Sequence, residues 1–121
     1  MPAGLVTSLN TRCEDSNACI REYSVIALGM IAESHLGLEE MCSCNSVRVL
    51  CDMMNDTDHP TRCNVFLALI KICYTPKGVE LVLVQNQALE IIIEKARWDD
   101  LEVRCRRTHR VFRSWWHLTL V

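Results

Sequence analysis

Glycine and proline are scarce in this sequence, and long apolar segments are missing from it. It has 4 glycines and 3 prolines among 121 residues, half of which are apolar. That balance excludes a collagen-like chain, a disordered chain and a loop-rich disulfide scaffold. The longest apolar run, Val65 to Ile70, is far shorter than the roughly 20 residues that span a bilayer. The opening residues, Met1 to Gly4, do not resemble a secretory signal. We therefore expect a single domain in the cytoplasm or on the cytoskeleton, with no membrane partner.

The short motifs of common catalytic sites are also missing. The sequence contains no glycine-rich phosphate loop, dinucleotide-binding motif, zinc-protease His-Glu pair or Gly-x-Ser-x-Gly turn. Its acidic pairs, Glu39-Glu40 and Asp99-Asp100, are adjacent, so their side chains diverge around a helix and do not flank one substrate. We expect a protein that is not an enzyme, with no catalytic residue and no cofactor.

Cysteine, by contrast, is abundant, with 8 residues. Cys42 and Cys44 form a Cys-x-Cys pair instead of the Cys-x-x-Cys pair of a zinc ribbon, and no second pair stands at ligand spacing. Most of the cysteines stand in apolar stretches, which predicts reduced thiols that pack as small core residues, and no metal site. They occupy positions 13, 19, 42, 44, 51, 63, 73 and 105.

An internal repeat of about 41 residues organises the chain. Sliding the sequence by this period aligns identical residues at apolar and at turn-like positions. A shift longer by one position continues the match into a third, partial copy with Arg104 and Cys105. The identical pairs are Val6 and Val47, Leu9 and Leu50, Asp15 and Asp56, Arg21 and Arg62, Ala27 and Ala68, Leu28 and Leu69, Ile31 and Ile72, Gly37 and Gly78, Glu39 and Glu80, and Asn45 and Asn86.

Each copy has helical periodicity. Apolar or small residues recur at three- and four-residue spacing in both long segments, which predicts one buried helix face in each. Asp15-Ser16-Asn17 and Asp56-Thr57-Asp58 offer side-chain oxygens to the free amides at a helix start, and Pro60 suits a first turn. Gly37 and Gly78 are predicted to mark the break before a short helix. The buried faces are expected at Ile20, Ser24, Ala27, Leu28 and Ile31, and at Val65, Ala68, Leu69 and Ile72. The expected helices span about 4–13, 17–34, 37–43, 46–54, 60–74, 77–85, 88–97 and 100–117.

Short, medium and long helices at this period predict an all-α, right-handed armadillo-type superhelical solenoid with about two and a half repeats of roughly 41–42 residues. Repeats bury their apolar faces only against their neighbours, so an exposed first repeat needs an explanation. Either the chain is a fragment of a longer solenoid, which we favour, or its open end stacks on another subunit. The solenoid is expected over residues 1–104.

Residues 105–121 depart from the repeat. The register places Arg110 where Ala68 packs, and a close-packed position does not accept an unpaired charge. This basic and aromatic segment is either a specialised cap or a tail outside the repeat. Residues 1–96 carry 12 acidic and 7 basic groups, whereas residues 97–121 carry 3 acidic and 6 basic groups. Binding to an acidic surface through this tail is the third and least favoured function, and we expect no specific nucleic-acid binding.

The long helices of an armadillo superhelix line its concave groove, where import and catenin relatives carry Trp and Asn ladders. That ladder is absent here, because the matching positions hold Ile26, Leu67 and His109, and Met30, Lys71 and Arg113. Recognition of nuclear-localisation peptides is therefore not expected. Ordinary solvated positions are the default interpretation of the groove residues, and a few partner contacts are expected among them. The candidate partner-binding residues are Tyr23, Met30, Glu33, Asn64, Lys71 and Tyr74 in the groove, and Arg107, Arg110 and Arg113 in the tail.

A local succession of motifs resembles one family more than armadillo proteins in general. It consists of Asp15-Ser16-Asn17 with Ile20-Arg21, Met54-Asn55-Asp56, Arg62-Cys63-Asn64 and Pro76-Lys77-Gly78. The succession is similar to that of the radial spoke head 14 homolog family of cilia and flagella, over about residues 5–97. The resemblance implies a structural subunit of the axonemal radial spoke, bound to other spoke subunits. Members of that family are longer. The alternative is a general cytosolic or nuclear armadillo adaptor that binds a partner peptide in its groove.

Overall fold

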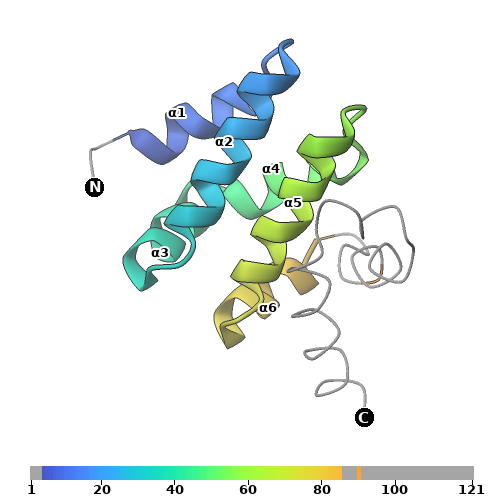
Figure 1. The fold of residues 1–121 in the computed structure, drawn as a ribbon. Helices are drawn as coiled ribbons and strands as arrows, with labels where there is room; N and C mark the ends of the chain where they lie inside the picture. The colour runs from blue at the N-terminus through green and yellow to red at the C-terminus, as the bar shows by residue number, and fades with distance from the viewer. Residues whose placement is uncertain (1–3, 86–89, 91–121) are drawn as a thin grey trace.

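The computed structural model describes residues 4–85 and 90, and it is helical over that part of the chain, with no strand (Figure 1). This confirms the all-α prediction, and the expected helices as far as residue 85 are all present. The predicted helices at 88–97 and 100–117 lie outside the described residues. The helices are α1 (Leu5–Arg12), α2 (Ala18–Ile31), α3 (His35–Ser43), α4 (Ser46–Asp52) with the 3-10 turn η1 (Met53–Asn55), α5 (His59–Ile72) and α6 (Pro76–Leu83).

The helix boundaries repeat with the same period as the sequence. The first residue of α4 follows the first residue of α1 by one full period, and the same separation relates α6 to α3. α5 matches α2 at both ends under the same shift, and each has 14 residues. The recurrence found in the sequence is therefore also a recurrence of three helices in space.

Side-chain caps start the two long helices. The Asn17 side chain accepts a hydrogen bond of 2.8 Å from the Cys19 N–H at the start of α2. At the equivalent place in α5, Asp58 accepts one of 3.1 Å from the Thr61 N–H. Pro60 stands in the first turn of α5, where a missing N–H leaves no hydrogen bond unmade. The predicted caps are confirmed.

Gly37 and Gly78 do not mark the breaks, contrary to the prediction. The short helices begin after Ser34 and Thr75, whose hydroxyls accept hydrogen bonds from the glycine N–H groups at 2.9 and 3.0 Å. Both glycines therefore lie inside the first turn of a helix. A Cβ on Gly37 would collide with the backbone carbonyl of Ile31 at the end of α2, and one on Gly78 with that of Ile72. Glycine is required there because two backbones approach closely.

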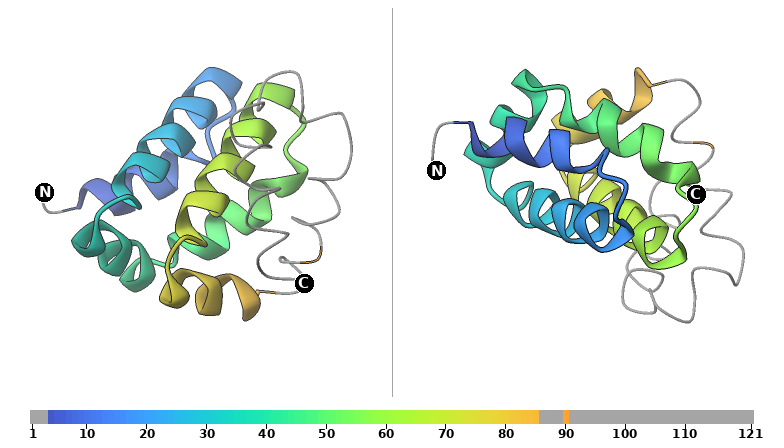
Figure 2. Two further views of the ribbon diagram at one scale, coloured as in Figure 1. Left: turned by 60° about the horizontal axis from the view of Figure 1, so that its bottom comes forward. Right: turned by 90° about the horizontal axis from the view of Figure 1, so that it is seen from above.

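The helices form two layers. α2 and α5 lie side by side in one layer, α1 and α4 lie behind them, and α3 and α6 lie together at one end (Figures 1 and 2). The contact between α2 and α5 is the most extensive in the described part of the molecule. Between the layers lies one apolar core, in which Leu28, Met41, Leu50, Leu69 and Ile72 are the largest fully buried side chains.

The buried face of α5 is as predicted, and that of α2 is only partly so. Every predicted core position of α5 is buried, and so are Ser24 and Leu28 of α2. Ile20, Ala27 and Ile31 are only half-buried. Ile20 and Ala27 each precede by two positions a residue that contacts α5, Glu22 and Gly29, and so lie on the opposite side of α2.

The cysteines are reduced in the described part of the chain, and most are shielded from solvent. Cys13, Cys51, Cys63 and Cys73 are buried, while Cys19 is exposed and thus not a core residue. Burial, as the leading cause, raises the pKa of Cys51 to about 12 and the pKa of Cys73 to about 11. These thiols therefore stay protonated at neutral pH and act as apolar packing groups.

Candidate protein-binding surface

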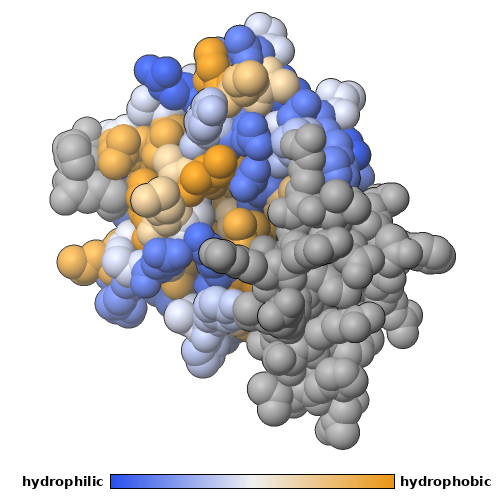
Figure 3. Space-filling view, in the orientation of Figure 1, coloured by the Kyte–Doolittle hydropathy of each residue, from blue (hydrophilic) through white to orange (hydrophobic). Residues whose placement is uncertain are grey.

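An exposed apolar stripe runs along α2. Tyr23, Ile26 and Met30 are 68%, 36% and 63% exposed. Their spacing of three and four residues places them on one face of the helix. Figure 3 shows this face of the molecule with apolar patches in its middle and toward the left, interspersed with polar surface. Exposed apolar side chains that gather on one face are typical of protein-binding surfaces.

Three of the candidate residues link α2 to α5. The Lys71 ammonium lies 2.9 Å from a carboxylate oxygen of Glu33. The Asn64 amide donates to the side chain of Glu22 at 2.9 Å and to the Pro60 carbonyl at 2.9 Å. The structure thus brings Glu33, Asn64 and Lys71 into the seam between the long helices, where each already has a partner.

The other candidates divide into two groups. Tyr23, Met30 and Tyr74 keep more than half of their surface exposed, so they are the ones with apolar surface to offer a partner. Tyr23 and Met30 share the stripe on α2, whereas Tyr74 follows the end of α5. Arg107, Arg110 and Arg113 lie outside the described residues.

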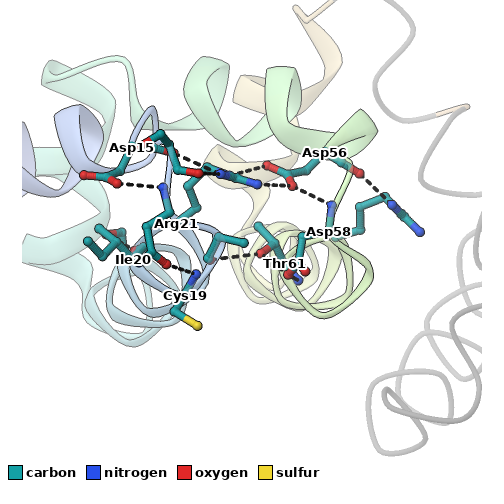
Figure 4. Close-up of polar contacts among 12 residues, drawn as sticks. Asp15, Cys19, Ile20, Arg21, Asp56, Asp58 and Thr61 are labelled. Atoms are coloured by element: carbon teal, nitrogen blue, oxygen red, sulfur yellow. Dashed lines mark hydrogen bonds and ion pairs between the residues drawn. The ribbon is translucent and has the colours of Figure 1, made fainter.

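A bidentate ion pair joins the starts of the long helices (Figure 4). The Arg21 guanidinium donates from Nε and Nη2 to the two carboxylate oxygens of Asp56 at 2.9 and 3.0 Å. Its Nη1 also donates to the main-chain oxygens of Asp15 and Ser16 at 2.9 and 3.1 Å. Arg62 repeats the second contact one unit later, with Nη1 at 2.6 Å from the Asp56 main-chain oxygen. Each arginine of the repeat therefore holds the loop before its own helix, and Arg21 also reaches the next unit.

Both members of this pair stand at repeated positions of the sequence, but the repeat alone does not predict that they pair. The signal was the coincidence of Arg21 with Arg62 and of Asp15 with Asp56 under one shift. Burial would raise the pKa of Asp56, but its hydrogen bonds from Arg21 and from the Asp58 N–H outweigh burial and lower that pKa. The hydrogen bond to Asp56 likewise raises the pKa of Arg21. The carboxylate and the guanidinium are both charged at neutral pH.

Comparison of this chain with known protein families, curated proteins and solved structures finds no match. Within the described ranges, no helix is long and apolar enough to cross a membrane. The same part of the chain holds no group of three His, Cys, Asp or Glu side chains arranged to bind a metal ion.

The surface has the composition of a contact site for another protein. An apolar stripe supplies the area that is removed from water on binding, and a charged pair at its edge, Glu33 with Lys71, supplies a polar rim. Tyrosine and methionine suit such a site, because both are enriched at interfaces and adapt to irregular partners.

Proposed function

We propose that this chain is an armadillo-type helical-repeat protein that works without catalysis, by binding other proteins as a structural component. The observation that carries the proposal is the recurrence of a three-helix unit at the period of the sequence repeat, together with the exposed stripe of α2. Units of this kind stack into right-handed superhelices whose long helices line one surface. The three helices per unit favour the armadillo type over two-helix repeats.

Within this class, we propose a place in the ciliary or flagellar axoneme, as a subunit of the radial spoke. This part of the proposal rests on the resemblance of the motifs between residues 15 and 78. A spoke subunit needs stable contacts with several neighbours and no active site. Helix faces that remain uncovered on a repeat protein provide such contacts.

Stepwise fractionation of tagged protein from ciliated cells tests the axonemal assignment. Axonemes are stripped first with detergent and then with salt, and each fraction is probed for the chain and for known spoke subunits. Retention through detergent and release together with spoke subunits at high salt is the expected result. Recovery in the soluble or nuclear fraction would refute the assignment and favour a general adaptor with the same fold.

Met30→Glu tests whether the stripe on α2 makes the contact. Met30 is exposed, so the substitution leaves the core unchanged while it places a charge in the apolar stripe. We expect the variant to keep the circular dichroism and thermal unfolding of the parent chain and to lose retention in axonemes. Leu36→Glu is the matched control, since Leu36 is also an exposed apolar residue but belongs to α3 instead of α2. Equal retention of both variants in axonemes would show that the stripe on α2 does not make the contact.

A further inference from the structure

The contact between α2 and α5 shows how one unit of this chain binds the next. The two helices run in the same direction, because their contacts advance together along both. Near the helix starts, the Thr61 hydroxyl donates to the Ala18 carbonyl at 3.4 Å. Further along, Ala68 lies against Gly29, where a Cβ added to the glycine would stand 3.3 Å from that of Ala68. The Glu22–Asn64 and Glu33–Lys71 contacts alternate with these two.

Four residues of α5 make the contacts described above with α2 or the residues just after it. Their equivalents one repeat earlier lie on α2, on the side that faces away from α5. Moving back by one repeat from Thr61, Asn64, Ala68 and Lys71 leads to Ile20, Tyr23, Ala27 and Met30. Tyr23 and Met30 are exposed, and Ile20 and Ala27 are half-buried. This face, which we call the vacant face, therefore has the geometry of a helix-binding surface, with small Ala27 at the point of closest approach. It is also more apolar than the face of α5 that contacts α2.

A carboxylate stands at the end of the vacant face. Asp15 corresponds to Asp56, and both turn in the same way, since one Oδ1 accepts the Asn17 N–H at 2.8 Å and the other accepts the Asp58 N–H at 2.9 Å. Asp56 binds the arginine of the preceding helix. No lysine or arginine side chain of residues 4–85 forms an ion pair with Asp15. Asp15 can therefore accept hydrogen bonds from the arginine of a helix that packs on the vacant face, as Asp56 does from Arg21.

We propose that the vacant face binds an α-helix of a partner protein, parallel to α2, whose arginine pairs with Asp15. This deepens the proposed function, on which it rests, by stating the chemistry of one partner. Four residues in α2 or just after it contact α5 or the loop before it, and they define the required pattern: Arg21, Glu22, Gly29 and Glu33. The partner carries arginine, then an apolar residue at the next position to cover Tyr23. Eight residues after the arginine it has glycine or alanine against Ala27, and twelve residues after it an apolar residue over Met30.

A second copy of this chain does not meet these requirements. In such a copy, Arg21 already binds Asp56. The copy also carries Glu22 and Glu33 at the two positions that would cover Tyr23 and Met30. Burying carboxylates against apolar side chains is unfavourable. In its α5 the position that corresponds to Gly29 holds Ile70, which is neither small nor free, since it is only 7% exposed. The requirement for an arginine beside apolar residues therefore points to a helix other than α2 or α5 of a second copy.

A peptide with a sequence derived from α2 tests the proposal. The probe is a fluorescent peptide of residues 14–34 with Glu22→Leu and Glu33→Leu, titrated with the full 121-residue chain and followed by anisotropy. A second peptide carries Arg21→Glu in addition. We expect the first peptide to bind and the second to bind at least about tenfold more weakly, because a like charge then faces Asp15. The chain variant Asp15→Arg should reverse this order of preference.

Two further measurements keep the result interpretable. The chain variant Ala27→Leu fills the point of closest approach and should abolish binding of the first peptide while circular dichroism shows an intact fold. Equal binding of the two peptides to the parent chain, or full binding to Ala27→Leu, would overturn the proposal. A concentration-dependent dimer of the chain alone that Met30→Glu dissolves would identify a second copy as the occupant, and so would also overturn it. Co-fractionation with spoke subunits in cells is independent of the peptide result, so the two proposals can fail separately.

Discussion

Ala27 and Ala68 occupy the same position in successive units, yet the structure predicts opposite responses to enlargement. Ala68 is 2% exposed and its side chain meets Gly29 across the seam between α2 and α5. Leucine at this position adds three carbon atoms where no space is left, and overpacking of this kind costs about 1–3 kcal/mol. Ala27 is only half-buried and lies about half a turn around α2 from Gly29, away from the contact with α5. Ala27→Leu should therefore change the free energy of unfolding by less than about 0.5 kcal/mol.

Urea unfolding followed by far-ultraviolet circular dichroism measures both variants against the parent chain. With a slope of about 2 kcal/mol per molar urea, a loss of about 2 kcal/mol lowers the midpoint by roughly 1 M. Ala68→Leu should show that shift, and Ala27→Leu should leave the midpoint nearly unchanged. Equal shifts for the two variants, or a larger one for Ala27→Leu, would refute the assignment of Ala68 to a packed seam and of Ala27 to an open face.

Three further predictions concern charge, backbone approach and thiol reactivity. The pKa of Asp56 is lower in the folded than in the unfolded chain. Its ion pair with Arg21 therefore stabilises the fold above about pH 4, and this contribution is lost as the pH falls through the pKa that Asp56 has in the folded chain. Asp56→Asn, and equally Arg21→Gln, should flatten the acid-side decrease of the free energy of unfolding in urea titrations, and a slope like that of the parent would contradict this. Gly37→Ala should destabilise the fold by about 1–3 kcal/mol through collision with a backbone carbonyl, and a parent-like urea midpoint would argue against that contact. Labelling with N-ethylmaleimide, followed by peptide mass spectrometry, compares two thiols. Exposed Cys19 should react in the native state, whereas Cys73, which is buried and has its pKa raised to about 11, should react only after unfolding. Comparable reaction rates for the two cysteines would exclude the described burial of Cys73.

Most of the fold could be predicted from local signals. Helix periodicity, oxygen-bearing caps such as Asn17 and Asp58, and Pro60 each act within a few residues, so their effect can be read without knowledge of the rest of the chain. The helix boundaries followed these signals closely. The predicted role of Gly37 was wrong. A glycine is needed there because of a carbonyl at the end of the preceding helix, and that contact lies outside the helix to which Gly37 belongs.

The candidate surface was less predictable, since exposure depends on which elements lie next to each other. Glu33, Asn64 and Lys71 look like surface residues in the sequence, but they pair across the seam between the long helices. Ile20 and Ala27 have the spacing of core residues and are nevertheless half-buried. Periodicity specifies which residues share a face of a helix, and it does not specify what covers that face.

The helical class, the repeat period and the equivalence of positions between units can be inferred from the sequence alone, because they depend on local propensity and on identity at a fixed spacing. Only the tertiary structure decided that Arg21 reaches Asp56, and that one face of α2 is packed while the other stays open. Successive units carry equivalent residues at matching positions, whereas burial and pairing arise only where a neighbouring unit is present to meet them.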